Sequence, residues 1–275
     1  MLDAPENILG PAVTAAGRRL AEAGCARPDA DARVLAAAAL GGPEASSAAG
    51  ARFEKLVTRR AAREPLAYLL GRASFRSLEL HVDSRVLIPR PHTEPLVEAA
   101  LVLPRGARVL DLCTGSGAVA LSLKHERPDL EVAGADLSTE ALAVARANGE
   151  RLGIEVSWLE SNLLAGAPGP WDAVLANPPY VDEDEPALAR EMVGHEPLLA
   201  FRGGDGGLAV IRSLLGQVAA LPWMALEVGD DHAPTVRDLL TRAGFAEVRS
   251  HRDFTGVERV LVGRRAHHPS RGRSP

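Results

Sequence analysis

The stretch Arg108-Val-Leu-Asp-Leu-Cys-Thr-Gly-Ser-Gly117 has the pattern of an apolar strand that runs directly into a glycine-rich turn. Residues 118–125 follow with apolar side chains at helical spacing, so the turn is expected to join a strand to a helix. Glycines permit tight turns and close approach of a ligand, and a helix N-terminus offers free N–H groups and a positive dipole end. In open α/β sheets ligands bind at the carboxyl ends of strands. The stretch therefore predicts an α/β sheet with a ligand site at this turn.

Two familiar glycine-rich motifs do not match the turn, and a carboxylate further along narrows the choice of ligand. Ala120 stands at the third glycine of a dinucleotide-binding motif, a position where alanine is sometimes allowed, and no Gly-Lys-Ser/Thr follows as in a phosphate-binding P-loop. Asp136 ends the next expected strand, about 20 residues past the glycines, where a carboxylate can accept hydrogen bonds from both ribose hydroxyls. Either feature alone also fits a structural role; together they favour a nucleoside-containing cofactor.

Downstream of the turn, strand and helix patterns alternate. Strands are expected at 108–112, 131–136, 154–159, 171–176 and 223–228, with helices at 118–125, 139–152, 208–219 and 234–243. Such alternation predicts a mostly parallel sheet covered on both faces. Two further strands, expected at 246–251 and 259–263, follow one another without a helix, which predicts an antiparallel edge.

Upstream of the sheet the pattern changes twice. Residues 1–74 are rich in Ala and Arg with helical apolar spacing, which predicts a small helical domain; its helices are expected at 11–22, 29–41 and 48–63. Alternation at 75–82 predicts a strand that turns at Asp83-Ser84 into a second strand at 85–88, giving a β-hairpin linker over 75–91. Thr93 is expected to cap a helix over 94–103 at the start of the main domain, 92–264. A basic tail, 265–275, is expected to be disordered.

The motif Asn177-Pro178-Pro179-Tyr180 directly follows the fourth strand expected after the glycine turn. Two prolines fix φ and remove two backbone donors, so the carbonyls between them can face a ligand. The Asn177 side-chain carbonyl and the Pro178 carbonyl can then accept both N–H bonds of a planar, conjugated NH2 group, while Tyr180 stacks on its plane. Such a nitrogen is a poor nucleophile, and orientation toward a methyl sulfonium would activate it by positioning and electrostatics. A plain strand-exit turn, or a Pro-Pro-Tyr ligand of a WW domain, fits the position opposite the glycine turn less well.

Composition excludes several other classes of protein. A formal net charge of −5 lacks the basic footprint typical of nucleic-acid binding, and no apolar run reaches the ~20 residues that span a bilayer. Cys25 and Cys113 stand far apart with no Cys or His at metal-ligand spacing. We therefore expect a soluble, cytoplasmic protein without a metal, a membrane segment or direct nucleic-acid contact, and we expect a monomer.

From Arg63 to Arg264 the chain resembles the bacterial glutamine-N5 methyltransferases that modify peptide chain release factors. The residues that carry the resemblance are Glu64-Pro65, Tyr68, Gly71, Leu87 to Glu94, Leu110 to Gly117, Asn177 to Tyr180 and Glu258-Arg259-Val260. The Asn-Pro-Pro-Tyr element is shared with adenine-N6 and other amino-methylating enzymes of nucleic acids. The segment from Ile88 to Glu94 is more particular to the protein-modifying group.

The resemblance implies a Rossmann-like class I methyltransferase sheet that uses S-adenosylmethionine. It implies that the helical domain recognises class I release factors, and that the acceptor is the glutamine of their Gly-Gly-Gln loop. The implied cofactor contacts are Cys113, Thr114, Gly115, Ser116, Gly117, Asp136, Leu163 and Asn177. The implied substrate contacts are Asn177, Pro178, Pro179 and Tyr180, of which Asn177, Pro178 and Tyr180 are the catalytic residues.

Three positions depart from the family pattern, and three other functions stay open. His92 replaces a usual Asp and is interpreted as surface variation, Cys113 often appears as Gly and is interpreted as packing, and Asn162-Leu163 replaces an acidic-aromatic pair near the adenine pocket. The first alternative is a glutamine methyltransferase of a large-subunit ribosomal protein. The second is an adenine-N6-type methyltransferase of nucleic acids, and the third is a pseudoenzyme that binds partners through the helical domain.

Overall fold

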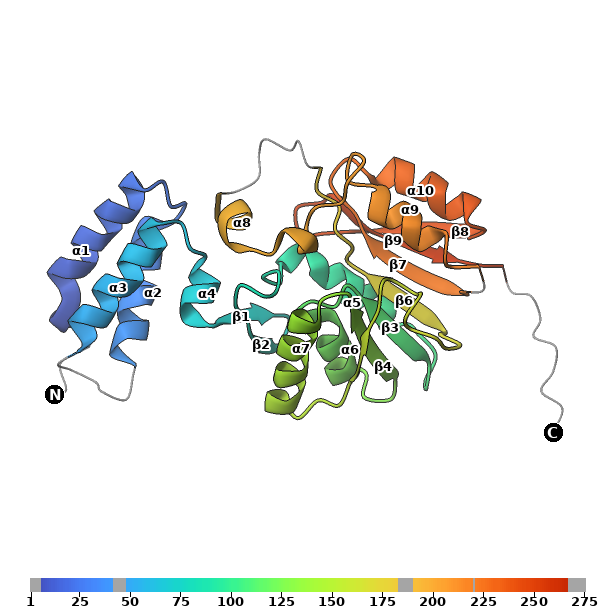
Figure 1. Ribbon diagram of the computed structural model, residues 1–275, viewed down its shortest axis with the longest axis horizontal. Coiled ribbons are helices and arrows are strands. Elements are labelled where there is room, and N and C mark those ends of the chain that lie inside the picture. The colour runs from blue at the N-terminus through green and yellow to red at the C-terminus, as the bar shows by residue number, and fades with distance from the viewer. Residues whose placement is uncertain (1–5, 42–47, 183–189, 220, 267–275) are drawn as a thin grey trace. The chain divides into compact units, whose positions relative to one another are not determined.

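The computed structural model describes residues 6–41, 48–182, 190–219 and 221–266 (Figure 1). The chain divides into two compact units. The first consists of Met1–Arg72 and Ala187–Glu196, and the second of Ala73–Pro186 and Pro197–Pro275. The segment Ala187–Glu196 therefore belongs to the helical unit, although it is far from the other residues of that unit in sequence.

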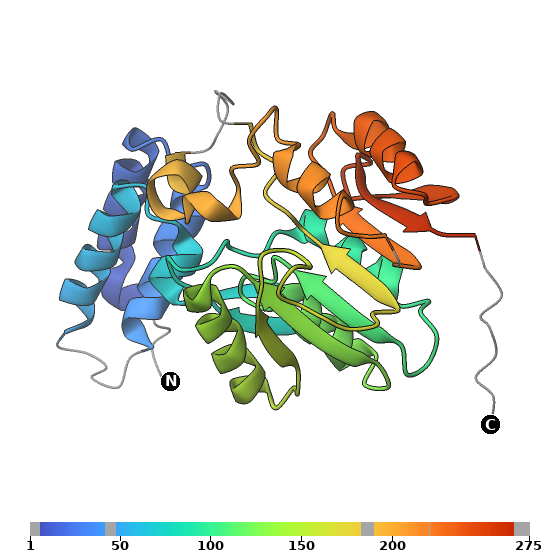
Figure 2. The same cartoon turned by 45° about the vertical axis from the view of Figure 1, so that its right-hand side comes forward.

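The first unit is a helical bundle. Its helices are α1 (Glu6–Glu22), α2 (Pro28–Leu40), α3 (Ala49–Ala61), α4 (Leu66–Leu70) and α8 (Arg190–His195). The three helices expected from apolar spacing are confirmed as α1 to α3, which lie side by side in Figures 1 and 2. Leu20, Leu35 and Phe53 contribute to their shared core. The short helices α4 and α8 were not predicted, since each is too short to show a helical period.

A hairpin starts the transition to the second unit, at a different place from the one expected. Strands β1 (Arg72–Phe75) and β2 (Leu78–His81) form a two-stranded sheet with a turn at Arg76-Ser77. The strand expected at 85–88 is wrong, because Asp83 accepts hydrogen bonds from Arg85 and so makes a turn that leads into irregular chain. The alternation of apolar and polar residues over 75–82 continues across the true turn, so the pattern did not reveal where the chain turns.

The second unit contains a seven-stranded sheet in the order β5-β4-β3-β6-β7-β9-β8. Its strands are β3 (Arg108–Leu112), β4 (Glu131–Asp136), β5 (Ser157–Glu160), β6 (Ala173–Ala176), β7 (Trp223–Glu227), β8 (Glu247–Arg252) and β9 (Glu258–Arg264). The pairs from β5 to β7 are parallel, whereas β9 pairs antiparallel with both β7 and β8. The predicted mostly parallel sheet with an antiparallel edge is confirmed.

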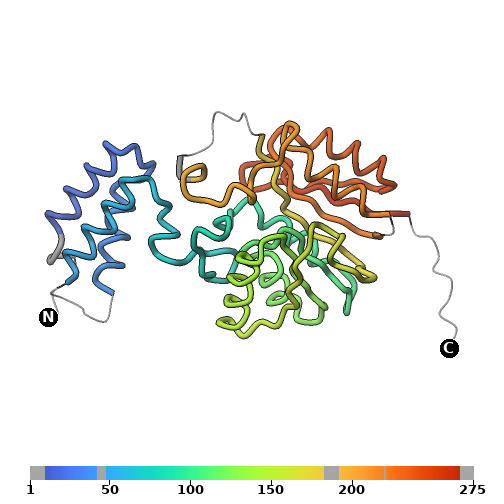
Figure 3. Tube along the Cα trace, in the orientation of Figure 1, coloured from blue at the N-terminus to red at the C-terminus, as the bar shows by residue number. Residues whose placement is uncertain are grey.

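Helices cover both faces of this sheet. They are α5 (Glu94–Ala100), α6 (Ala118–Glu126), α7 (Thr139–Leu152), α9 (Ala209–Leu215) and α10 (Ala233–Arg242). Successive strand residues point to opposite faces, so Val109 joins the core that contains α5 and α6, whereas Leu110 joins the core that contains α9 and α10. The chain trace in Figure 3 follows the crossovers between these layers. The glycine turn and the acceptor motif both leave the sheet at the carboxyl ends of adjacent parallel strands, β3 and β6.

Several boundaries differ from expectation. Strand β5 begins at Ser157 and not at Ile154, and helix α9 ends at Leu215, before Gly216. Most of the tail expected at 265–275 lies outside the described residues. Among the helices that the structure describes, none is long and apolar enough to cross a membrane.

Candidate active site

The glycine turn after β3 adopts a backbone that few residue types tolerate. Cys113, Gly115 and Gly117 all have positive φ, at 56°, 54° and 82°. Gly117 begins α6 as its N-cap, and a Cβ placed there would lie 2.9 Å from the Trp158 ring. Gly117 therefore meets both a conformational and a steric requirement, and the turn brings the backbone close to the cavity described below.

Asp136 lies at the end of β4 and holds this turn in place. Its Oδ2 accepts a hydrogen bond of 2.9 Å from the Gly115 N–H, and its Oδ1 accepts one of 2.9 Å from the Ser138 N–H. Burial raises the pKa of Asp136, against the lowering effect of these backbone donors. Since each carboxylate oxygen has two acceptor sites, both can still accept hydrogen bonds from hydroxyl groups of a ligand.

A second carboxyl, Asp111, lies beneath the turn and was missed as a site residue. It is 1% exposed, and its Oδ2 accepts hydrogen bonds from the Thr114 hydroxyl at 2.5 Å and the Ala120 N–H at 3.2 Å. Burial raises its pKa to about 7. The signal was an aspartate inside an otherwise apolar strand, where an ionisable group is rarely buried without a function or a partner.

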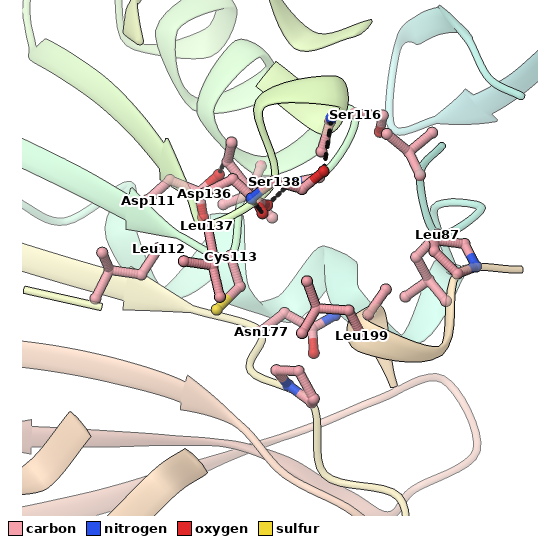
Figure 4. Close-up of a pocket in the computed structure, with 18 of the residues that line it drawn as sticks. Leu87, Asp111, Leu112, Cys113, Ser116, Asp136, Leu137, Ser138, Asn177 and Leu199 are labelled. Atoms are coloured by element: carbon pink, nitrogen blue, oxygen red, sulfur yellow. Dashed lines mark hydrogen bonds between the residues drawn. The ribbon is translucent and has the colours of Figure 1, made fainter. Parts of the chain in front are cut away.

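A cavity of about 390 Å³ opens at the carboxyl ends of these strands (Figure 4), a size typical of small-molecule sites. Of the predicted site residues, it is lined by Cys113, Thr114, Gly115, Ser116, Asp136, Leu163, Asn177 and Pro179. Gly117, Pro178 and Tyr180 do not line it. In Figure 4, Asn177 and Leu199 lie at one end of the cavity, away from Asp136 and Ser138.

The turn after β5 forms another wall. Leu163 has a positive φ of 56° and is buried, and the Ser161 hydroxyl donates to its carbonyl at 2.5 Å. Ser161 and Asn162 line the cavity beside Leu163. Leu137 also lines the cavity, although its side chain is half exposed. Ser161, Asn162 and Leu137 were not predicted as contacts.

Asn177 leaves β6 with its side-chain amide held by Thr93. The Asn177 Nδ2 donates to the Thr93 Oγ1 at 3.3 Å, which leaves the Asn177 Oδ1 as an unused acceptor in this pair. The prediction that Thr93 caps α5 is wrong: Thr93 makes no capping hydrogen bond, because its backbone already has helical angles after the 3-10 turn η1 (Pro91–Thr93), whereas an N-cap residue needs an extended backbone.

Thr93→Val is expected to lower about ten-fold the kcat of the methyl transfer that the sequence predicts. The side-chain amide of Asn177 loses the acceptor that sets its orientation, worth about 1–1.5 kcal/mol for a neutral hydrogen bond. Turnover under saturating substrates checks this. Thr241→Val, at an exposed position of α10, serves as the control. It removes a hydroxyl whose one hydrogen bond within the described part of the chain goes to the Arg237 carbonyl. Equal turnover of Thr93→Val and Thr241→Val would exclude Thr93 as the residue that orients the Asn177 amide.

Tyr180 directs its hydroxyl away from the cavity. It donates a hydrogen bond of 2.9 Å to Oε1 of Glu227, which ends β7 with an exposed fraction of 0%. Burial raises the pKa of Glu227 to about 7, while the neighbouring Thr93 and Tyr180 hydroxyls lower it. Burial and the adjacent Glu227 raise the pKa of Tyr180, so the phenol is neutral. Sequence reasoning missed Glu227 because, unlike Asp136, it stands at no recognisable spacing from a glycine-rich turn.

A glycine-rich loop braces the acceptor motif from behind. In Gly203-Gly-Asp-Gly-Gly207, a Cβ at Gly207 would lie 2.1 Å from the Tyr180 carbonyl oxygen, and a Cβ at Gly203 would lie 2.8 Å from the Pro179 carbonyl oxygen. Gly203 also donates from its N–H to the Val181 carbonyl at 2.8 Å. The four glycines within five residues are a sequence signal for such a close approach of two backbones, and no prediction was made from them.

His92 lies beside Glu227, so its interpretation as surface variation is wrong. Its Nε2 is 3.5 Å from the Glu227 Oε1. Burial lowers the pKa of His92 to about 4, with help from the positive charges of Arg259 and Arg90. The imidazole is therefore neutral near pH 7. Cys113 packs against the core beneath the cavity, where burial raises the pKa of its thiol.

Models of two known domains match the chain. The Methyltransferase small domain matches residues 92–216, which contain both the glycine turn and the acceptor motif. The PrmC N-terminal domain matches residues 12–71, which run from within α1 to the end of α4 in the helical unit. Within the described residues, no group of three or more His, Cys, Asp or Glu side chains is arranged to hold a metal ion.

Similar proteins extend over nearly the whole chain. A release factor glutamine methyltransferase of Deinococcus radiodurans is 42% identical over 92% of this chain and 97% of its own. The release factor glutamine methyltransferase of Gloeobacter violaceus is 43% identical over 81% of this chain and 82% of its own. A methyltransferase structure from Pyrococcus furiosus covers 78% of this chain and 98% of its own with a TM-score of 0.54; at 18% identity it shows the common fold alone.

Proposed function

The chain belongs to the release factor glutamine methyltransferase family, and on this premise we propose that it methylates the side-chain amide nitrogen of a glutamine in class I peptide chain release factors. The acceptor is the glutamine of their Gly-Gly-Gln loop, and the methyl donor is S-adenosylmethionine. The observation that carries the proposal is Asn177, whose amide is oriented by Thr93 at one end of a cavity that also holds Asp136. Methyl transfer to an amide nitrogen requires a group that orients this nitrogen beside the methyl donor. The Asn177 side chain in a cavity with a nucleoside site meets this requirement.

The residues of the cavity fit S-adenosylmethionine. Its ribose hydroxyls are donors that the Asp136 carboxylate can accept, and its positive charges suit a cavity with two carboxyl groups, Asp111 and Asp136. The remaining contacts that we propose are the turn from Cys113 to Gly117, Leu163 and Asn177. When bound, S-adenosylmethionine supplies a methyl group on a positively charged sulfur.

The acceptor motif then orients the substrate amide. We propose that the Asn177 Oδ1 and the Pro178 carbonyl accept its two N–H bonds, which turns the nitrogen lone pair toward the methyl group. Pro179 borders the same end of the cavity, and Tyr180 holds the plane of the amide. The Tyr180 hydroxyl has a fixed partner in Glu227, which supports a defined ring position. The protein thus contributes positioning and electrostatics.

Substrate choice follows from several observations together. The related proteins named above are release factor glutamine methyltransferases, which favours a release factor over a ribosomal protein as the acceptor. The net charge of −5 disfavours a nucleic-acid substrate. We propose that residues 1–74 recognise the release factor, and that the enzyme works as a cytoplasmic monomer without a metal.

The substrate class can be tested by incubation with isotopically labelled S-adenosylmethionine and a panel of purified acceptors. The panel contains class I release factors, ribosomal large subunits and adenine-containing oligonucleotides. Label is expected in the release factors alone. Label in a ribosomal protein or an oligonucleotide, with none in the release factors, would replace the proposed substrate by the corresponding alternative.

Asp136→Ala is expected to weaken S-adenosylmethionine binding by about 1.5–3 kcal/mol, roughly ten- to two-hundred-fold in Kd, because charge-assisted hydrogen bonds to the ribose are lost. Isothermal calorimetry measures this directly. Asp172→Ala, at an exposed carboxyl whose Oδ2 accepts from the Arg108 N–H, is the control. Wild-type affinity in Asp136→Ala would exclude the ribose contact.

A further inference from the structure

Glu227 is a fully buried carboxyl that the proposed reaction does not yet use. Its Oε1 accepts the Tyr180 hydroxyl at 2.9 Å, and among the described residues its Oε2 has no hydrogen-bond partner. An incompletely bonded buried carboxyl destabilises a fold. Because Glu227 bonds directly to Tyr180 of the acceptor motif, its destabilising effect on the fold indicates a functional role that involves Tyr180.

The charged groups around Glu227 are mostly paired with one another. Arg259 on β9 donates to Asp230 at 2.6 Å, to Asp253 at 3.2 Å and to the Val228 carbonyl at 3.0 Å. Its guanidinium donors are therefore directed at these groups, and among the described contacts Arg259 makes no direct ion pair with Glu227. Glu227 is left facing neutral donors.

Those neutral donors come from two different elements. Tyr180 lies in the loop after β6, while His92 and Thr93 lie in η1. The Nε2 of His92 approaches the same Glu227 oxygen that accepts the Tyr180 hydroxyl, at 3.5 Å. We call Glu227, Tyr180 and His92 the carboxyl cluster. One buried oxygen thus links Tyr180 of the acceptor motif to a residue of the segment before α5.

We propose that Glu227 is a positioning residue for methyl transfer, which holds the Tyr180 ring against the substrate amide, and that His92 contacts the same Glu227 oxygen as part of this cluster. The proposal rests on the proposed function, because it assigns Tyr180 to the plane of the glutamine amide. Glu227 touches neither substrate nor cofactor and acts only through the Tyr180 hydroxyl. Its loss is therefore expected to change kcat more than the KM of either substrate.

The ionised carboxylate is the stronger acceptor for the Tyr180 hydroxyl, so the cluster has a pH dependence. Burial raises the pKa of Glu227 to about 7, whereas His92 stays neutral and Tyr180 stays a donor over the same range. Activity is expected to fall as pH decreases through the pKa of Glu227. Asp111 titrates in the same range, so the contribution of Glu227 has to be isolated by substitution.

Glu227→Gln keeps an oxygen acceptor for Tyr180 and removes the titration. Its kcat at about pH 8.5 is expected to stay within about three-fold of wild type, and its fall toward pH 6 is expected to be shallower. Glu227→Ala is expected to lower kcat about ten-fold or more by releasing the ring. Glu131→Gln, at an exposed carboxyl of β4, should keep the wild-type pH profile. An unchanged profile in Glu227→Gln, or unchanged kcat in Glu227→Ala, would overturn the proposal.

A double-mutant cycle separates positioning from a general effect on the fold. In a Tyr180→Phe background, Glu227→Ala is expected to change kcat less than about two-fold, since the hydroxyl through which it acts is gone. Additive losses would contradict action through Tyr180. His92→Asp, which places a carboxylate beside Glu227, is expected to raise the pH at which activity falls by about one unit. No such shift would remove His92 from the carboxyl cluster.

The ring itself gives a readout that needs no turnover. The chain has two tyrosines, so ring-labelled tyrosine gives two sets of NMR signals. Glu227→Ala is expected to shift or broaden the signals of Tyr180 and to leave those of Tyr68 unchanged. Glu227→Gln is expected to preserve the signals of both tyrosines. Unmoved Tyr180 signals in Glu227→Ala would refute the positioning role even if no release factor were methylated, so the two proposals can fail separately.

Discussion

Asn177→Ala is expected to lower kcat about a thousand-fold, the scale found when one oriented donor or acceptor of a reacting group is removed. The variant keeps the Pro178 carbonyl, so the substrate amide loses one of two acceptors and its lone pair is no longer held toward the methyl group. The loss should appear in kcat under saturating substrates far more than in the Kd of S-adenosylmethionine. Thermal denaturation should show a folded protein, because Asn177 is only partly buried and has one hydrogen bond to Thr93.

A graded comparison sharpens this test. Thr93→Val removes the group that orients the Asn177 amide and a hydroxyl that neighbours Glu227. Its loss should be smaller than that of Asn177→Ala, and the double variant should lose less than the two single losses combined. Turnover of Asn177→Ala within about three-fold of wild type would contradict the assigned role of the side chain.

Gly207→Ala is expected to lower kcat about a hundred-fold and to cost about 2–4 kcal/mol of folding free energy. The added Cβ would lie 2.1 Å from the Tyr180 carbonyl oxygen and 2.6 Å from the His232 ring, and the residue has a positive φ of 77°. Relief of this overlap has to displace the acceptor motif or the loop that braces it. Either displacement moves Tyr180 relative to the cavity.

Gly206→Ala is the matched control, because Gly206 also has a positive φ, at 62°, but a Cβ there meets no atom within 4 Å. It should cost about 1–2 kcal/mol from backbone strain alone and keep most of the activity. The measurements are kcat and the free energy of unfolding in denaturant. Equal losses in both variants would show that strain, and not contact with the acceptor motif, makes Gly207 necessary.

The sheet and the glycine turn could be predicted because their signals are local. Strand 108–112, the turn to Gly117 and the strand that ends at Asp136 each show their period within a few residues. Asn177 to Tyr180 was recognisable for the same reason. The hairpin was misplaced because alternation of apolar and polar residues continues through the Arg76-Ser77 turn, and periodicity alone does not reveal a turn of that kind.

The partners of the acceptor motif could not be predicted, since they come from distant parts of the chain. Thr93 is 84 residues from Asn177, and Glu227 is 47 residues from Tyr180. A threonine before a helix fits the pattern of a cap, and its true contact depends on the tertiary position of η1. His92 was misinterpreted for the same reason: its neighbour Glu227 lies on β7, and only the folded sheet brings the two together.

The position of the transferred methyl group tests the central claim most directly. A class I release factor is incubated with the enzyme and S-adenosylmethionine, and fragmentation mass spectrometry then locates the added methyl group within the peptide that contains Gly-Gly-Gln. We expect one methyl group on the side-chain amide nitrogen of that glutamine. When Asn177→Ala replaces the wild-type enzyme, we expect no detectable methyl group after the same short incubation. A methyl group on any other residue, or an unmodified glutamine after incubation with active enzyme, would contradict the account.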